Sequence, residues 1–331
     1  YETADKAASI VDYNKKDYVE LLFRYGKFLS EFAYFNEAKE IYQRLLSLCE
    51  ETFGYSKQTA SSYNNIGNVY GITGDYNKAL DFYNKALEIQ EKVLGEEHSD
   101  TTCSYNNIGL VYNDLGKYDE AFECHTKALE IRKKILGEEH TDTASSYNNI
   151  GNVYNDLGNY DKALKNHNKA LEIYKKVLSE ECSDTAMSYN NIGCDYYNLG
   201  NYDKALKCYT DALKTRKKVL GEEHTDTATS YNNIGSAYCK LGEYNKALDN
   251  FTKALKIQEK VLGEEHIDTA MTYHNIGSVD RKLGKYDDAL EYYDKALKIF
   301  QSKLGSEHSY TKSVVENISL VKDKQKQQSI D

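Results

Sequence analysis

The 331-residue chain contains no proline and no tryptophan. The absence of proline excludes proline-rich linkers, and a total of only 20 glycines leaves too few turn residues for a β-sandwich or β-barrel. Hydrophobic residues make up 40% of the chain, which is low for two thick globular cores. These shortages favour a mostly helical fold that exposes much surface per residue.

Long apolar runs and an excess of basic residues are also missing. No apolar stretch approaches the roughly 18 residues that a membrane-spanning helix requires, and the chain does not begin with a charged and then apolar leader. Lys and Arg number 42 against 52 Asp and Glu, so the net charge is −10. Nonspecific binding to nucleic acid or to a membrane surface is driven by basic excess, so we expect neither as a partner.

Cysteine usage and the lack of catalytic motifs bear on the compartment and the function class. Seven cysteines, an odd number without Cys-x-x-Cys pairs, predict a reducing, cytoplasmic setting rather than a disulfide framework. The sequence contains no phosphate-binding loop, Gly-rich dinucleotide fingerprint, His-Glu-x-x-His or Gly-x-Ser-x-Gly motif. We therefore predict a protein that is not an enzyme and that needs no cofactor.

A segment of sequence Tyr-Asn-Asn-Ile-Gly recurs along the chain with a period of 42 residues. It begins at Tyr63, Tyr105, Tyr147, Tyr189 and Tyr231, and it returns as Tyr-His-Asn-Ile-Gly at Tyr273. A threonine four residues before each of these tyrosines keeps the same period, and Thr311 continues it once more. Gly26 lies 41 residues before Gly67, which indicates a degenerate first repeat with one residue deleted in a loop. The chain is therefore a tandem array.

Each repeat predicts two helices joined by a tight turn. Tyr147, Ile150, Gly151 and Tyr154 have the spacing of a first helix, and Leu-Gly-Asn then interrupts the pattern. From residue 160 to 178, apolar residues recur at helical spacing for about five turns, which predicts a longer second helix. We expect Gly151 at the crossing of the two helices, where only a short side chain fits, and most of the 31 tyrosines in the core.

The link between successive hairpins carries glycine and histidine at fixed positions. Gly137, Gly221 and Gly263 follow the second helices at the place of a C-terminal cap. One position of the link is occupied in turn by His98, His140, Cys182, His224, His266 and His308. A metal ion needs several ligands within about 2 Å, and neighbouring repeats hold these residues apart. We therefore expect no metal site, and we assign the histidines to packing or capping of the link.

The repeat resembles the tetratricopeptide signature, with tyrosine in place of the usual tryptophan. The matching residues are Tyr147-x2-Ile150-Gly151-x2-Tyr154, followed by Ala163-x3-His167 and Ala170. The period exceeds the ordinary one of about 34, and the proline that ends the second helix is absent. In both respects the chain resembles the longer tetratricopeptide repeats of kinesin light chains and nephrocystin-like proteins, over about residues 18–310. The heptad segment by which a kinesin light chain holds its heavy chain is missing.

This resemblance implies an all-α fold, a right-handed α-α superhelix (tetratricopeptide solenoid) of about seven helical-hairpin repeats. We expect the solenoid to span residues 1–310 and a capping helix with a polar tail to span residues 311–331. The expected repeats are about 18–58, 59–100, 101–142, 143–184, 185–226, 227–268 and 269–310. Residues 1–15 fit the remnant of a preceding hairpin, and the lack of a Met at position 1 indicates a longer natural protein.

The resemblance also implies a concave groove built mainly from the first helices, which here are rich in asparagine. An amide both donates and accepts hydrogen bonds, so a column of amides at repeat spacing can hold the backbone of an extended peptide. Related repeat proteins use the second asparagine of the pair in this way. We therefore assign peptide binding to that residue in each repeat and to two neighbours: Asn65, Asn107, Asn149, Asn191, Asn233 and Asn275, with Asn68 and Asn152.

Two alternatives for the groove stay open. The same amides could tie adjacent first helices together or cap exposed carbonyls, with their repetition reflecting duplicated sequence.

Basic residues are sparse, so the clamp by which some tetratricopeptide domains hold a terminal carboxylate is not reproduced. The candidate basic contacts, most of which we expect to be solvated, are Arg24 and Lys27 in the first repeat and Lys240, Arg281 and Lys282 near the last.

Together these features predict a protein-protein interaction scaffold that binds an extended peptide or unstructured segment in the Asn-lined groove. A kinesin-light-chain-like adaptor is one form of such a scaffold. An alternative is the regulatory or sensor region of a larger signalling or NTPase protein, and a third is self-assembly by end-to-end stacking of repeats. The sequence does not identify the partner, the pathway or the oligomeric state.

Overall fold

The computed structural model describes residues 15–328, which form fifteen α-helices and no β-strand. The predicted all-α fold of helical hairpins is confirmed. The chain divides into two compact units, residues 1–158 and 159–331. The expected remnant of a preceding hairpin falls, apart from Lys15, outside the described residues, as does the end of the predicted tail at residues 329–331.

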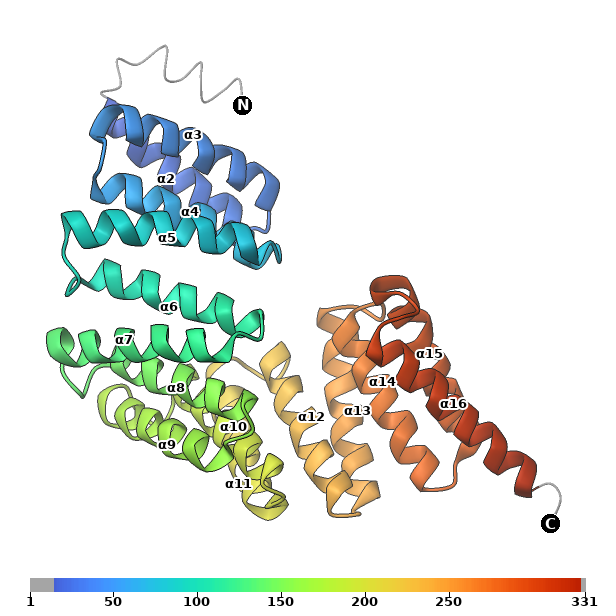
Figure 1. The fold of residues 1–331 in the computed structure, drawn as a ribbon. Helices are drawn as coiled ribbons and strands as arrows, with labels where there is room; N and C mark the ends of the chain where they lie inside the picture. The colour runs from blue at the N-terminus through green and yellow to red at the C-terminus, as the bar shows by residue number, and fades with distance from the viewer. Residues whose placement is uncertain (1–14, 329–331) are drawn as a thin grey trace. The chain divides into compact units, whose positions relative to one another are not determined.

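In the first unit, each helix packs against the next one along the chain (Figure 1). The helices are α2 (Lys15–Glu31), α3 (Phe35–Phe53), α4 (Lys57–Ile72), α5 (Tyr76–Val93), α6 (Ser99–Asp114), α7 (Tyr118–Leu136) and α8 (Thr141–Asp156). The first helix of a hairpin, such as α4, is shorter than the second, such as α5, as the sequence predicts. α6 also contacts α8, so first helices of successive hairpins touch.

The second unit repeats this arrangement. Its helices are α9 (Tyr160–Val177), α10 (Ser183–Asn198), α11 (Tyr202–Val219), α12 (Thr225–Lys240), α13 (Tyr244–Val261), α14 (Ile267–Lys282), α15 (Tyr286–Leu304) and α16 (Ser309–Gln328). First helices again touch, α12 with α14 and α14 with α16. α16 buries Val314, Ile318 and Val321, and its last turns are polar.

The histidines of the links are N-caps of the first helices. In α8, Nδ1 of His140 accepts a hydrogen bond from the backbone N–H of Asp142 at 3.1 Å, and His98, His224 and His266 do the same in their links. Cys182 takes this role for α10, with Sγ accepting from the N–H of Thr185 at 3.4 Å. The predicted capping role is confirmed. It satisfies one of the backbone donors that a helix leaves unpaired at its start.

The link glycines and the repeat threonines fix the conformation of each link where it leaves the second helix. Gly137, Gly221 and Gly263 have φ values of +90°, +95° and +89°, a conformation that favours glycine, so their predicted place after the second helices is confirmed. The hydroxyl of Thr143 donates to the carbonyl oxygen of Gly137 at 2.8 Å, and the equivalent bond recurs in the other links. The threonine that keeps the 42-residue period therefore joins the end of one hairpin to the start of the next.

The motif glycine of a first helix lies against a ring of the second helix. A Cβ atom on Gly67 would come within 2.7 Å of the Tyr83 ring, and a Cβ atom on Gly193 would come within 2.6 Å of the Tyr209 ring. Both tyrosines are buried, so their rings have little room to move. The predicted need for a short side chain at the helix crossing is confirmed at these two equivalents of Gly151.

We expect Gly67→Ala and Gly71→Ala to have opposite effects on stability, although both glycines lie in α4. Gly67→Ala drives a methyl group into the Tyr83 ring and should lower the free energy of unfolding by about 1–3 kcal/mol. At Gly71 the nearest atom to an added Cβ is the Tyr83 hydroxyl oxygen, 3.8 Å away, so alanine should raise stability by about 0.5 kcal/mol through its helix propensity. Denaturant titration of both variants measures the two effects, and effects of equal sign would contradict this packing.

Successive hairpins meet through one buried position of the second helix, whose residue we call the junction residue. The junction residues are Cys49, Gln90, Arg132, Tyr174, Arg216, Gln258 and Phe300. Ser104 Oγ lies 2.6 Å from Gln90 Oε1. At the next junction, Arg132 Nη1 donates to Ser146 Oγ at 2.7 Å and to the Asp142 carbonyl oxygen at 3.0 Å. Repeats that share the Tyr-Asn-Asn-Ile-Gly motif therefore differ in the bonds at their interfaces.

Candidate functional site

A groove of about 680 Å³ crosses the first helices of the first unit. Its wall is formed by α2, α4 and α6, with Tyr42 of α3 and Tyr83 of α5. Three of the predicted peptide-binding residues, Asn65, Asn68 and Asn107, lie in this wall. The groove therefore brings together predicted residues from two successive repeats.

The asparagines of this groove differ in how much of their hydrogen-bonding capacity is used. Asn68 Oδ1 accepts a hydrogen bond from Tyr83 Oη at 2.7 Å, which orients that amide. Asn65 and Asn107 are half-buried and have no side-chain hydrogen-bond partner among residues 15–328. A polar group that lacks a protein partner is stabilised when a ligand or water bonds to it. These two amides can therefore bond to the backbone of a bound segment.

Apolar side chains accompany the amides, and charged ones are few. Ile72 is 62% exposed and Leu110 is 43% exposed in the groove wall, so both offer apolar surface to a ligand. Lys27 and Glu31 form an ion pair of 3.7 Å on α2. Burial, and then the nearby Asp156, raises the pKa of Asp114 at the other edge. The chemistry of this groove is therefore mainly that of amides and aliphatic side chains.

Two other predicted residues bond to the preceding repeat. Asn149 Nδ2 donates to Asn106 Oδ1 at 2.8 Å in the first unit, and Asn233 Nδ2 donates to Asn190 Oδ1 at 2.8 Å in the second. In both pairs the second asparagine of one repeat meets the first asparagine of the repeat before it. These bonds have the helix-tying role that the sequence left open, and each donor amide keeps one N–H and its oxygen for other contacts.

The remaining predicted residues, Asn152, Asn191 and Asn275, are half-buried on α8, α10 and α14. Next to Asn275, His274 takes the place of the first asparagine, and its Nε2 lies 3.1 Å from Asn317 Nδ2 on α16. Burial, and then the charge of Arg281, lowers the pKa of His274. The ring is therefore neutral near pH 7, and Nε2 can accept the bond that asparagine accepts elsewhere.

The predicted basic contacts fall into two groups. On α2, Arg24 and Lys27 are exposed and pair with Glu20 and Glu31 on the same helix, as solvated charges do. In the second unit, a pocket of about 330 Å³ is lined by Cys239, Lys240, Tyr244, Ser278, Val279, Arg281 and Lys282. The sequence places these three cations in two repeats, and the structure brings them together.

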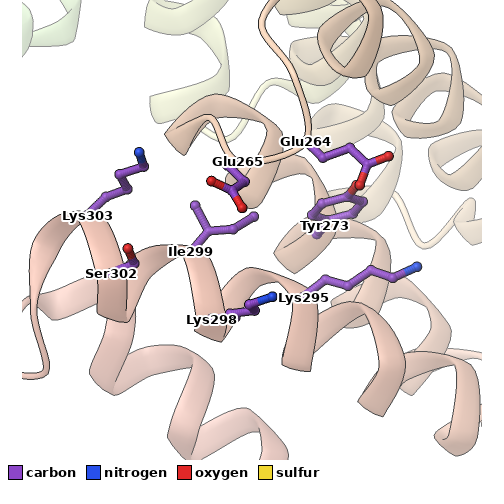
Figure 2. Close-up of a pocket in the computed structure, with 8 residues that line it drawn as sticks. All are labelled: Glu264, Glu265, Tyr273, Lys295, Lys298, Ile299, Ser302 and Lys303. Carbon is purple, nitrogen blue, oxygen red and sulfur yellow. The ribbon is translucent and has the colours of Figure 1, made fainter.

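A different pocket, of about 190 Å³, lies between the link that precedes α14 and helix α15 (Figure 2). Its residues include Tyr273 and Lys295, whose Nζ lies 5.8 Å from the centre of the Tyr273 ring. The Tyr273 hydroxyl donates to Glu259 Oε1 at 2.6 Å, and Lys295 Nζ donates to Glu291 Oε1 at 2.7 Å. Both of these polar groups therefore already have hydrogen-bond partners.

The motif tyrosines contact both the core and charged side chains: Tyr105 and Tyr273 are buried, and Tyr63 is partly exposed. The Tyr63 hydroxyl donates to Glu50 Oε1 at 2.6 Å, and the Tyr105 hydroxyl bonds to Glu91. Lys85 Nζ lies 5.8 Å from the centre of the Tyr63 ring. A tyrosine suits this place because its ring packs on apolar groups and attracts a cation while its hydroxyl bonds to a carboxylate.

Sequence reasoning missed the aliphatic part of the groove. Ile72 occupies a position that holds Asp114 and Asp156 in later repeats, and Leu110 occupies the position of Asn68. A position that varies among nearly identical repeats can face a different group in each of them. That variation was the signal that could have pointed to these residues.

Metal clusters, disulfides and membrane spans are missing from the part of the chain that the structure describes. Within residues 15–328, no group of three or more His, Cys, Asp or Glu side chains is placed to hold a metal ion. All seven cysteines are free thiols. No helix in this range has both the length and the apolar character to cross a bilayer.

Comparison with protein families identifies the repeat. The tetratricopeptide repeat family matches residues 21–92, 100–176, 184–260, 226–302 and 268–329. These segments cover most of the chain. The sequence matches none of the curated proteins with which it was compared.

Solved structures agree with the family match. BtubC (BKLC) from P. vanneervenii is 25% identical, with a TM-score of 0.58 over 66% of this chain and 88% of that one. A putative kinesin light chain with nearly identical TPR-like repeats from Podosopora anserina is 22% identical, with a TM-score of 0.53 over 62% and 97%. A signal transduction ATPase (STAND protein) with a tetratricopeptide repeat sensor from Pyrococcus horikoshii is 21% identical, with a TM-score of 0.66 over 93% and 44%. The last two likenesses show the fold alone.

Proposed function

Because the chain belongs to the tetratricopeptide repeat family, we propose that it is a protein-interaction scaffold that binds an extended peptide segment in the groove across α2, α4 and α6. One observation carries this proposal. Asn65 and Asn107 are half-buried without side-chain partners among residues 15–328, and they lie in one groove of about 680 Å³ with the exposed Ile72 and Leu110.

An extended segment is the ligand that suits this wall. The backbone of an extended peptide presents N–H and C=O groups along its length, and a carboxamide can bond to either. The aliphatic side chains between the amides then contact the side chains of the segment, and their burial adds to affinity. The alternative of a sensor region in a larger signalling or NTPase protein stays a prediction, because the likeness to the STAND protein shows the fold alone.

We expect the double variant Asn65→Ala, Asn107→Ala to bind groove ligands at least about fivefold more weakly than the wild type. Each lost hydrogen bond costs about 0.5–1.5 kcal/mol net, and two such losses correspond to roughly a 5- to 150-fold rise in Kd. Peptides selected by display against the wild-type chain serve as ligands, and titration calorimetry measures Kd. The loss should depend only weakly on salt, because the amides are neutral.

The matched control is Asn77→Ala, Asn84→Ala, which removes two exposed amides from α5 outside the groove. It should leave Kd unchanged, and both double variants should melt near the wild-type temperature. Asn149→Ala, which removes the bond to Asn106, should instead lower the melting temperature. Equal affinity of the groove variant and the wild type would reject the groove as the binding site.

A further inference from the structure

We infer that the pocket lined by Lys240, Arg281 and Lys282 in the second unit is an anion subsite that takes acidic side chains of a peptide partner. This inference rests on the proposed function, because it adds a charged contact point to a scaffold that binds peptides. It differs from the groove of the first unit in chemistry, since that groove acts through neutral amides.

The pocket lies where two first helices end. α12 ends at Lys240 and α14 ends at Lys282, and Tyr244 at the start of α13 contributes to the wall. Three of the seven lining residues are cationic, and none of the seven is acidic. Ser278 and Tyr244 add hydroxyl donors to the same space of about 330 Å³.

These three cations lack the acidic partners that other basic residues nearby possess. Lys246 pairs with Glu243, whereas none of the three forms an ion pair among residues 15–328. Arg281 Nε is buried and has no hydrogen-bond partner. A guanidinium N–H that has left water without gaining an acceptor favours the arrival of an anion, because a carboxylate can accept from two of its N–H groups.

Among the described residues, no acidic side chain lines the pocket to cancel this positive charge. Burial raises the pKa of Cys239 to about 11, so its thiol stays protonated at neutral pH. Asp280 is 3% exposed and lies 3.9 Å from Lys285, outside the lining of the pocket. Each helix C-terminus adds roughly half a negative charge, so two of them leave the three cations in excess.

Comparison with the earlier repeats shows that basic residues first occur at the end of a first helix in α12 and α14. The position of Lys240 and Lys282 holds Ile72, Asp114, Asp156 and Asn198 in earlier repeats. The equivalent end of a first helix is therefore apolar, acidic or neutral until α12 and α14. The sequence predicts mostly solvated charges here, and the shared pocket and the buried Arg281 Nε are what the sequence alone does not show.

The test uses a fluorescein-labelled oligoglutamate peptide as the probe and fluorescence anisotropy as the measurement. The protein carries a net charge of −10, so its overall field repels this probe. Binding must then come from a local basic site. We expect saturable binding that weakens between 0.05 and about 0.3 M salt, since the interaction of exposed charges is screened within about 10 Å at 0.1 M.

The variant Lys240→Asn, Lys282→Asn places at both positions the residue that Asn198 already supplies in an earlier repeat, so the fold should tolerate it. It should weaken oligoglutamate binding about tenfold or more, through the loss of charge-assisted contacts. The control Lys165→Asn, Lys256→Asn makes the same change in net charge at exposed lysines outside the pocket. It should change Kd less than about twofold.

Three outcomes overturn the subsite: no binding of oligoglutamate by the wild type, equal binding by oligolysine, or equal losses in the pocket variant and the control. Each of these leaves the groove of the first unit untouched, because its ligands are the selected peptides and its test variant is Asn65→Ala, Asn107→Ala. Conversely, oligoglutamate binding that only the pocket variant loses supports the subsite even if the groove variant keeps full affinity.

Discussion

Replacing His167 by phenylalanine is expected to lower the free energy of unfolding of the second unit by about 1–3 kcal/mol. His167 Nδ1 and Asp195 Oδ2 lie 2.6 Å apart, and the two side chains are 1% and 0% exposed. The substitution removes the hydrogen bond between the imidazole and the Asp195 carboxyl group, neither of which reaches water, and the loss of a buried hydrogen bond is destabilising. Denaturant titration, with hydrogen exchange of the α9 and α10 amides to locate the loss, measures the effect.

A second substitution should recover most of this stability. The variant His167→Phe, Asp195→Val copies Phe251 and Val279, which occupy the same two positions two repeats later and are both buried. Exchange of a buried, hydrogen-bonded polar pair for well-packed apolar residues of similar shape is often neutral or stabilising. A double variant as unstable as His167→Phe, or a single variant as stable as the wild type, would show that the pair does not have this role.

The first unit is expected to lose stability in weak acid because of His125. Its Nδ1 is buried without a hydrogen-bond partner, and the side chain is 1% exposed. Burial, and then the charge of Arg132, lowers the pKa of His125 from 6.5 to about 4. Between these values the unfolded chain binds a proton that the folded unit does not. The free energy of unfolding is therefore unaffected above about pH 6.5 and falls by about 3 kcal/mol as the pH drops to 4.

The variant His125→Phe isolates this contribution from that of the carboxylates. Phe251 packs against Gly235 in the way that His125 packs against Gly109, so the ring fits. Denaturant titrations of wild type and variant from pH 7.5 to 4 give the difference in unfolding free energy at each pH. That difference should shift by about 3 kcal/mol in favour of the variant as the pH falls. Parallel curves would mean that His125 takes up its proton equally in both states.

The fold could be predicted because its signals are local and recur in each repeat. Three signals act within a few residues or within one hairpin: the glycine of the motif, the glycine of the link and the capping histidine. The structure predicted for one repeat therefore applies to the next repeat as well. The contact between His167 and Asp195 could not be predicted from such local signals. Asp195 stands where four other repeats have valine and one has Ala237, and only the packing of α9 on α10 shows what it meets.

The candidate site was only partly predictable, because identical motifs give their second asparagine different partners. Arg132 donates to the hydroxyl oxygen of Ser146, and Asn106 is then left to bond with Asn149. Sequence spacing places these four residues in the right repeats. It does not say which donor reaches which acceptor. That depends on whether packing of the helices brings the two atoms within hydrogen-bonding distance.

The Gln90 junction shows the opposite outcome. Ser104 Oγ lies 2.6 Å from Gln90 Oε1 and 3.0 Å from Asn64 Oδ1. Asn64 is therefore engaged by the serine, and Asn107 has no amide of the preceding repeat to bond with. This is the physical reason that Asn107 faces the groove with its capacity unused while Asn149, in the same motif, does not.

Glutamine and arginine at the junction position give two kinds of interface beneath the same asparagine motif. In the second unit, Arg216 bonds to Ser230 beside the pair of Asn190 and Asn233, and Gln258 follows the pattern of Gln90. The asparagines of the motif recur along the chain, yet an exchange between glutamine and arginine at the buried junction position changes which of them bond to the preceding repeat. The buried junction residues thus set the hydrogen bonding of the asparagines, so repeats that share one motif are not equivalent in the amides they leave unbonded.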